Sequence, residues 1–532
     1  MHHCLCLDEI IRFVAHELIA AKQNATAVAL ACCCKSFEDP VLDALWGTQC
    51  NFILLLKTLP TDIWSPSGYK VSIVITVIDL YLLNYMIWKS LERLPTIHEW
   101  TRLRKYAQRI QGIQESGALS LLSSQVLSAL RFHALNEPLL PNVRTLRWWF
   151  TPETEEVIPF IPLFLSTRTT TIDLIFPGSD LDKVTTASVI TDFPTLCPNL
   201  QNIRLAGLPR DPMVTAAVSE LVLNTKQNTL RTFDVDLTLT EEAYEVICKH
   251  HDLDELQVVF DRPITLPTIV LPNLINIDIE YAHGHDWLQG FRGASLEKLT
   301  LVTISSESDS IDDLLGAFES VALTTSIPTT LSSFRFKTDR LWRPSYRPLL
   351  PFTQLVDLLI ESPCEDECSS TIDDDTITNL AQAMPGLELL HLGNTSCETP
   401  GGVTVKGLTA LAYCCPRLFN LTIHFQAASL DPAEVPHPPY TPESIIPRAG
   451  CGLHYLEAGH IRVPEGSELM IAMTLLHVFP HLEEIGYSDC VGWETVSTAL
   501  HYSRQLAHSS GLCLFAVFWN ITHHTSSARS YA

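Results

Sequence analysis

The sequence predicts an α/β protein in which a short helical N-terminal domain is followed by a curved solenoid. The solenoid would carry parallel strands on its concave face and helices on its convex face. Three observations predict this class: an apolar L-x-x-L-x-L frame recurs along the chain, helix-period segments separate its copies, and a proline precedes several copies. With 532 residues the chain is too long for one compact core, which favours an elongated array.

The frame is clearest at Leu200, Ile203 and Leu205, within the stretch CPNLQNIRLAGL. This is the spacing of a leucine-rich repeat, in which a short strand turns alternate side chains toward the core. Strong copies begin at residues 143, 200, 230, 253, 274, 296, 331, 355, 387, 418 and 482, and weaker copies begin at 169, 453 and 512. Between 169 and 296 the steps are 31, 30, 23, 21 and 22 residues, so the period is loose but unbroken. We expect about fourteen strands.

Amphipathic helices are expected between the strands. Their apolar spacing places them at 213–223, 241–249, 311–321, 376–384, 405–414, 468–479 and 495–506. Several end at a proline just before the next strand, as in CPNL, MPGL, CPRL and FPHL, because proline cannot continue a helix. Each unit leaves one strand face and one helix face bare, so it is stable only when stacked on its neighbours.

Composition excludes several classes of partner. The formal net charge of −25 would repel nucleic acid and anionic lipid alike. The sixteen cysteines are scattered or adjacent, as in Cys32 to Cys34, which suits buried thiols in a reducing compartment better than a disulfide framework. The N-terminus has no basic segment before Asp8 and Glu9, so no secretory signal is expected. A cytoplasmic or nuclear location follows as an expectation.

Three regions are expected: a helical domain at 1–50, a helical linker at 51–140 and the solenoid at 141–532. In the first, apolar residues from Leu7 to Leu18 recur at three- and four-residue steps, and two further short helices follow. The linker contains a helical pattern with a basic outer face at 95–110. Spacing alone is also typical of a small helical cap for a solenoid.

The N-terminal residues LCLDEIIRFVAHEL, followed by VALACCCKSFEDPVLDALW, resemble the F-box-like domain that precedes degenerate leucine-rich repeats in proteins of mushroom-forming (basidiomycete) fungi. The stretch from Leu30 to Trp46 is the most specific part. The family usually has proline just before the Glu-Ile pair, where this chain has Asp8. The connecting helix at 95–110 also resembles one found in that family.

The resemblance implies that residues 5–46 dock on the Skp adaptor of a cullin-based ubiquitin ligase while the repeats choose a protein substrate. The docking residues that match the family pattern are Ile10, Ile11, Leu30, Pro40, Leu42, Leu45 and Trp46. The same apolar stripe must also hold the three helices together, so surface and core roles stay open. The alternative is an interaction scaffold without a ubiquitin role, in which these helices only cap the solenoid.

An apolar stretch, Val71 to Trp88, approaches the length of a membrane span and is flanked by Lys70 and Lys89. Asp79 and Asn84 lie inside it, and centring a carboxylate in hydrocarbon costs about 2.5 to 3.5 kcal/mol. A buried element is therefore favoured over a span. A third interpretation is an insertion foreign to the family, including a gene-model error.

Catalytic and metal signatures are absent from the sequence. No dinucleotide or phosphate-binding glycine loop, nucleophile elbow or H-E-x-x-H helix occurs. Cys364 and Cys368, and separately His283 and His285, lack a second ligand pair at zinc spacing. The acidic run 373–375 suits a helix N-terminus better than a calcium loop. No enzyme activity, cofactor or metal is expected.

Polar strand residues should form the concave surface, because they alternate with the buried frame. The candidate partner-binding residues are Arg147, Trp149, Asn202, Arg204, Asp234, Asp236, Asp278, Glu280, Lys298, Arg335 and Lys337. Thr145, His391, Thr422 and His424 follow the same pattern. Their charge changes sign along the chain, which is compatible with ordinary solvated polarity or with a ligand groove selected by charge.

Overall fold

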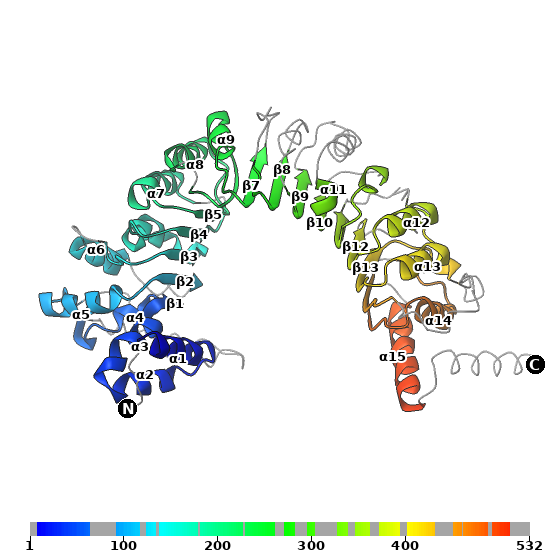
Figure 1. Cartoon of the computed structure of the whole chain (residues 1–532), viewed down its shortest axis with the longest axis horizontal. Helices are drawn as coiled ribbons and strands as arrows, with labels where there is room; N and C mark the ends of the chain where they lie inside the picture. The colour runs from blue at the N-terminus through cyan, green and yellow to red at the C-terminus, as the bar shows by residue number, and fades with distance from the viewer. Residues whose placement is uncertain are drawn as a thin grey trace, which may run out of the picture. The chain divides into compact units, whose positions relative to one another are not determined.

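The computed structural model describes residues 8–63, 92–116, 124–134, 138–178, 181–226, 229–260, 271–281, 295–303, 327–338, 346–361, 372–393, 402–430, 451–459, 461–487 and 492–510. The chain forms two compact units, Met1–Val259 and Phe260–Ala532, called unit 1 and unit 2 below. In each unit, parallel strands are stacked side by side and helices lie on one side of them (Figure 1). The expected 71–88 element lies outside the described residues.

Unit 1 begins with three helices that share a small core. They are α1 Asp8–Ala20, α2 Asn24–Cys33 and α3 Lys35–Gly47. Ile11 and Ala15 of α1 meet Ala27 of α2 and Phe37 and Val41 of α3 in one buried cluster. The predicted helical N-terminus is confirmed.

Seven strands follow in unit 1, and each pairs in parallel with the next in chain order. They are β1 Thr48–Gln49, β2 Gly112–Ser116, β3 Thr145–Trp149, β4 Thr171–Ile175, β5 Asn202–Ala206, β6 Thr232–Thr238 and β7 Glu255–Phe260. The frame residues Ile203 and Leu205 are buried, with exposed fractions of 1% and 0%, and stack on their counterparts in β4 and β6. Strand alternation therefore produces the buried face that the spacing predicts.

Unit 2 contains eight described strands with the same parallel order. They are β8 Asn276–Tyr281, β9 Lys298–Thr303, β10 Ser333–Lys337, β11 Asp357–Glu361, β12 Leu389–Leu392, β13 Asn420–Ile423, β14 Tyr455–Gly459 and β15 Glu484–Tyr487. Together with β3–β7, these strands coincide with every predicted frame from 143 to 482. The frame at 512 lies outside the described residues. The α/β class and the solenoid order are confirmed.

Helices connect the strands, and most of them lie where the apolar spacing places them. They are α4 Ile53–Leu56, α5 Ile97–Ala107, α6 Ser124–His133, α7 Lys183–Leu196, α8 Pro212–Asn224, α9 Glu241–Ile247, α11 Ile327–Thr330, α12 Asp374–Ala383, α13 Val405–Cys414, α14 Glu468–Val478 and α15 Trp493–Ser510, with the 3₁₀ helices η2 Thr61–Ile63, η4 Pro152–Phe164, η6 Arg347–Leu349 and η7 Ala427–Ser429. The helix expected at 311–321 lies outside the described residues.

Side-chain caps start many of these helices. Asp182 accepts a hydrogen bond from the Val184 backbone N–H, and Asp211 accepts one from Met213. In unit 2, Asp373 caps α12 through the Thr376 N–H at 2.8 Å, which is the role expected for this acidic run. The Thr376 hydrogen bonds lower the pKa of Asp373, because they stabilise the carboxylate.

Sequence reasoning missed the strands β1 and β2 and the helices α4, α6, α7 and α11. In β2, Ile113 is the one buried frame residue, because its neighbours Gly112 and Gln114 carry no apolar side chain. Strand β1 has two residues, too few to show an alternating pattern. Helix α7 contains threonine, valine and isoleucine together with Pro194, all poor signals for a helix. Strands thus lie upstream of residue 141: β2 lies within the segment expected as a linker, and β1 lies at the end of the expected helical domain.

The described cysteines are free thiols. Cys197, Cys415 and Cys451 are buried, and burial raises the pKa of each to about 12, 12 and 11 respectively. The Cys451 Sγ lies 3.4 Å from the Leu418 carbonyl oxygen of the preceding repeat. Their position before the strand makes them packing residues. The expectation of buried thiols is wrong for Cys32 and Cys33, which are exposed on α2 and at its end.

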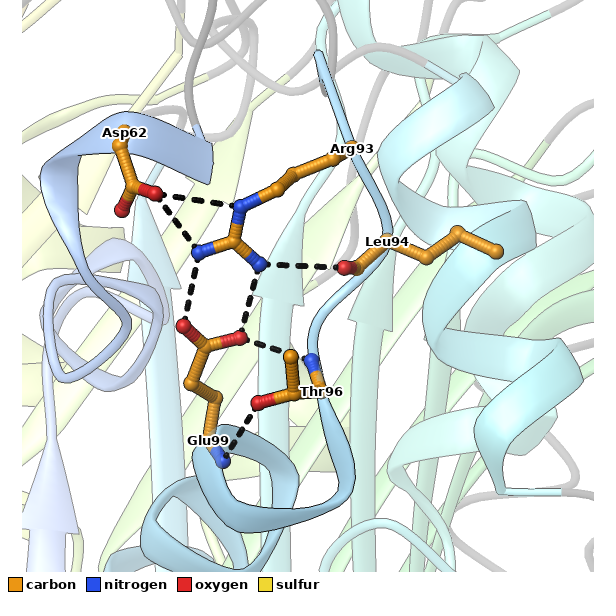
Figure 2. A network of polar contacts seen from close by, with 5 residues as sticks. All are labelled: Asp62, Arg93, Leu94, Thr96 and Glu99. Atoms are coloured by element: carbon orange, nitrogen blue, oxygen red, sulfur yellow. Dashed lines mark hydrogen bonds and ion pairs between the residues drawn. The ribbon is translucent and has the colours of Figure 1, made fainter.

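The residues on either side of the 64–91 segment are fastened to one another (Figure 2). The Arg93 guanidinium donates to Asp62 at 2.8 and 3.1 Å and to Glu99 at 2.7 and 2.9 Å. Glu99 also completes a capping box with Thr96 at the start of α5. The Glu92 backbone N–H donates to the Ile63 carbonyl at 3.0 Å. Residues Ile63 and Glu92, on either side of this segment, are therefore held close together.

Candidate functional site

The candidate site is the open face of the sheet in unit 1, meaning the face opposite the buried frame residues. Strand register aligns the middle residue of each strand from β2 to β7 into one line. This line, called the charge row, is Gln114, Arg147, Asp173, Arg204, Asp234 and Gln257. Basic and acidic side chains therefore alternate strand by strand, about 4.8 Å apart.

Two ion pairs form within the charge row. The Arg147 Nε lies 3.6 Å from the Asp173 Oδ2, and the Arg204 Nε contacts the Asp234 Oδ2. The two arginine side chains are 53% and 54% exposed, whereas the aspartates are 19% and 13% exposed. The guanidinium groups therefore stand above the carboxylates and are what an approaching molecule meets.

Burial controls the electrostatics of the acidic members. Burial raises the pKa of Asp234, the Arg204 charge opposes that rise, and the neighbouring charges of Asp173 and Asp236 add to it. The Asp173 Oδ1 is buried and has no hydrogen-bond partner among the described residues. The arginines thus offset an accumulation of buried negative charge.

Asp236 lies at the carboxyl end of this face and is tied to a turn. Its Oδ2 accepts a 2.7 Å hydrogen bond from the Gly207 backbone N–H, just after β5. Gly207 has φ +69°, and a Cβ there would collide with the Phe176 carbonyl oxygen. Burial raises the pKa of Asp236, while the Gly207 bond opposes the rise. Only glycine permits this closure of the corner.

An apolar shelf lies beside the charge row, two residues further along each strand. Trp149 of β3, Ile175 of β4 and Ala206 of β5 are aligned by register. Trp149 is 57% exposed, and the other two are partly exposed. Beneath the sheet, Trp148 and Phe150 stack with ring centroids 5.5 Å apart. A rigid buried layer therefore supports an exposed aromatic side chain.

The remaining predicted open-face residues lie where alternation places them. Asn202 donates to the Thr171 hydroxyl at 3.0 Å in the row beside the charge row. In unit 2, Lys298, Arg335 and Lys337 are exposed on β9 and β10. The neighbouring strands β8 and β11 carry acidic residues, namely Asp278, Glu280, Asp357 and Glu361.

Lys337 contacts Glu361 at 3.1 Å. Thr422 and His424 were expected to be open, but their exposed fractions are only 7% and 6%. That expectation is wrong for two reasons. Thr422 lies inside β13 between His391 and Glu457 of the neighbouring strands and is buried there, and His424 lies beyond the end of the strand, next to buried Phe425.

The predicted docking residues are divided between core and surface. Ile11 is buried, and Leu30 and Leu45 pack against the same helical cluster. Pro40 is buried, and the Trp46 ring lies 4.8 Å from that of Tyr106 on α5. Three of the predicted docking residues are partly exposed and do not belong to that cluster: Ile10, Leu42 and Trp46.

Exposed apolar side chains on these helices were missed from the sequence. Phe13 is 65% exposed, Val28 is 50% exposed and Val14 is 38% exposed. On α1 they follow the same three- and four-residue steps as the buried residues, so spacing alone does not separate the two faces. Asp173 and Ile175 were also missed, and the signal for them was the weak frame at 169.

The helical N-terminus is joined firmly to the first strands. Arg109, which follows α5, contacts the carboxylates of Asp39 and Asp43 on α3. The Gln111 backbone N–H donates to the Gly47 carbonyl at 2.7 Å, and α3 runs directly into β1. The three helices thus also close one end of the stacked strands.

Two kinds of feature are absent from the described residues. These residues contain no cluster of three metal-ligating side chains, and none of their helices has the length and apolarity needed to cross a membrane. The geometry instead offers a rigid, polar surface with one exposed aromatic residue.

No family model matches the chain, and no curated protein matches it. Three solved structures are similar to it. An internalin from Listeria monocytogenes has a TM-score of 0.29 and 12% identity, covering 70% of this chain and 92% of the other. The Rad7 and Elc1 complex in yeast has a TM-score of 0.34 and 13% identity, covering 92% and 94%. A leucine-rich-repeat protein from Leptospira interrogans has a TM-score of 0.26 and 11% identity, covering 72% and 85%.

Proposed function

We propose that this leucine-rich-repeat scaffold is a substrate-recruiting adaptor of a Skp-cullin-F-box type ubiquitin ligase. Helices α1–α3 would dock a Skp-type adaptor, and the open sheet face would bind a protein substrate. The observation that supports both roles is the separation of two surfaces: apolar Phe13 and Val28 are exposed on the helices, and Arg147, Trp149 and Arg204 are exposed on the sheet.

In this proposal the protein makes no covalent bond itself. It raises the effective concentration of its substrate near the ligase by holding both partners on one chain. The F-box-like resemblance of residues 5–46 supplies the adaptor, and through it the cullin. The role implies a cytoplasmic or nuclear protein, and the resemblance implies a fungal one.

A second candidate is an interaction scaffold without a ubiquitin role. The contacts of Arg109 with Asp39 and Asp43, and the direct passage of α3 into β1, favour it. These contacts give the helices a structural purpose as an end cap that needs no adaptor.

Co-purification of the full chain with a Skp-type adaptor from a basidiomycete distinguishes the two candidates. We expect the wild-type chain to retain the adaptor. The variant Ile10→Glu/Leu42→Glu and the variant Phe13→Glu should lose it, because each puts charge on the exposed side of the helices. Phe132→Glu, at a 64% exposed position on α6, is the matched control and should retain it.

Circular dichroism of each variant verifies that the helices remain folded. Failure of the folded wild-type chain to retain the adaptor would refute the ligase proposal and leave the scaffold. Equal retention by wild type and all variants would show that these helix surfaces are not the docking site.

A further inference from the structure

Arg147 and Arg204 present unused donor groups on the open face of unit 1. Each contacts its aspartate through Nε. In the described part of the chain, the Nη groups of the two arginines make no hydrogen bond to another residue. A guanidinium held at its Nε edge and open at its Nη groups is arranged to bind a carboxylate.

We propose that the open face of β3–β6 binds an acidic segment of a partner protein, whose carboxylates contact Arg147 and Arg204 and whose apolar side chain covers the Trp149 shelf. This deepens the proposed function, because it names the chemistry of what the sheet face would bind. It does not depend on whether α1–α3 dock a Skp-type adaptor.

The spacing of the two arginines sets the spacing of the ligand. They lie on β3 and β5, with β4 between them, so their backbones are about 10 Å apart. A segment in the polyproline II conformation advances about 3.1 Å per residue with three residues per turn, so its side chains i and i+3 lie on one face about 9 Å apart. The ligand crossing the strands therefore carries carboxylates at positions i and i+3.

The apolar shelf defines the second half of the ligand. Trp149, Ile175 and Ala206 lie two residues beyond Arg147, Asp173 and Arg204 on the same strands. The decrease in side-chain size from Trp149 to Ala206 leaves room above β5 for an aliphatic or aromatic residue. Exposed tryptophan beside arginine is typical of residues that dominate protein–protein binding energy.

Charge favours an acidic protein segment over nucleic acid or an anionic lipid surface. The chain as a whole carries −25, which repels a long polyanion, whereas a short segment meets mainly the two exposed guanidinium groups. Asp173 and Asp234 lie lower in the face and hold the arginines in place.

Selection from a random 12-residue peptide library displayed on phage, with the full-length chain as bait, tests the proposal. Peptides enriched by the wild-type chain should carry two acidic residues three positions apart and a nearby aliphatic or aromatic residue. The affinity of one such synthetic peptide is then measured by fluorescence anisotropy, together with a copy whose acidic residues are replaced by lysine.

Three variants separate the contributions of the arginine Nη groups and of Trp149 to the affinity for the peptide. Arg147→Lys/Arg204→Lys keeps both charges but removes the Nη groups, and it should weaken peptide binding by about 10-fold or more. Trp149→Ala should weaken it by a similar factor. The matched control is Arg144→Gln/Arg231→Gln, which removes two exposed arginines outside the charge row and should change affinity less than about 3-fold.

Three results would overturn the proposal: enrichment of basic peptides, absence of any enriched motif, or equal affinity of the acidic peptide for the wild-type chain and for Arg147→Lys/Arg204→Lys. Retained adaptor co-purification in that case would show that only the ligand assignment fails. Loss of adaptor binding with retained acidic-peptide selection would refute the ligase proposal alone.

Discussion

The open faces of unit 1 and unit 2 are built on the same strand geometry but organise charge differently. In unit 1, Arg147, Asp173, Arg204 and Asp234 alternate on successive strands and pair side by side. In unit 2, the basic residues gather on β9 and β10, between acidic residues on β8 and β11. The described part of unit 2 has one exposed large apolar residue within a strand, Tyr487, at its last strand.

The difference shows that the stacking of repeats and the chemistry of the open face depend on separate residues of one strand. The inward residues are leucine, isoleucine, valine and phenylalanine in both units, because each repeat must bury them against the next. The outward residues are not constrained by packing between repeats. Unit 1 therefore offers preorganised guanidinium groups, and unit 2 offers blocks of opposite charge.

The largest expected effect comes from the residues that the two units share. Leu205→Ala in unit 1 and Leu390→Ala in unit 2 each empty a fully buried site. We expect each to lower the free energy of unfolding by about 2 to 5 kcal/mol. Urea unfolding followed by circular dichroism measures this, with exposed Lys298→Ala as the neutral control. A near-zero effect in one unit would mean that the buried faces are not equivalent.

Helix capping should differ between the units. Asp374 accepts hydrogen bonds from Thr404 N at 2.7 Å, Thr404 Oγ1 at 2.6 Å and Gly407 N at 3.0 Å, so it joins α12 to α13. Asp211 in unit 1 accepts a hydrogen bond from the Met213 backbone N–H at the start of α8 and pairs with Lys183 at 3.0 Å. Asp374→Ala should cost about 2 kcal/mol and Asp211→Ala about 1 kcal/mol in thermal unfolding. Equal costs would argue against the link between repeats.

An ion-pair comparison should give a smaller difference. A double-mutant cycle on Arg204 and Asp234 should yield a coupling of about 1 kcal/mol, because Asp234 is mostly buried. Lys337 and Glu361 in unit 2 are both well exposed and should give about 0.3 kcal/mol. Raising the salt concentration should reduce the second coupling more. A stronger coupling in unit 2 would contradict the contrast between paired and segregated charge.

Histidine burial predicts a pH effect with a defined sign. Burial lowers the pKa of His250 in unit 1, and its ring nitrogens have no hydrogen-bond partner among the described residues. Burial also lowers the pKa of His391 in unit 2, but its hydrogen bond to the Gly393 carbonyl opposes this. Both rings are neutral above about pH 6.5.

As the pH falls below this value, the unfolded chain takes up the proton first, so stability decreases until the folded histidine also protonates. His250→Phe should therefore reduce the loss of melting temperature between pH 7 and pH 5 more than His391→Phe does. An unchanged pH slope in His250→Phe would assign the acid sensitivity to other groups.

Deleting residues 64–91 should have the smallest effect on unit 1. The Glu92 N–H already bonds the Ile63 carbonyl, and Arg93 already contacts Asp62, so a short glycine-serine linker can close the gap. We expect a melting temperature within about 2 °C of wild type, because the contacts that hold Ile63, Asp62, Glu92 and Arg93 together are kept. The Arg93→Ala variant of the deleted chain is the control and should be less stable. Collapse of the deletion variant would show that 64–91 belongs to the core.

The sequence predicted the repeat strands because their apolar period is local and recurs. Thirteen frames from 143 to 482 correspond to β3–β15. It did not reveal β2, because Ile113 is its one buried frame residue and a single apolar residue shows no period. Asp173 was missed for a similar reason, since its strand belongs to a weak frame.

The N-terminal helices show the limit of spacing more sharply. Ile11, Phe13 and Val14 follow one another on α1, yet the first is buried and the other two are exposed. Which face is covered depends on α2 and α3, and Trp46 is covered by Tyr106 from another helix. A stripe of apolar residues therefore identified the helices without identifying their free surface.

By itself, the sequence determined the strand order, the buried leucine face and the alternation that sends polar residues outward, because side chains of a strand alternate with a period of two. Only the tertiary structure decided that Arg147 lies beside Asp173 and Arg204 beside Asp234, and that Ile63 meets Glu92. These contacts join residues about 26 to 30 positions apart, and they depend on the register and loop closure of stacked repeats rather than on any local pattern.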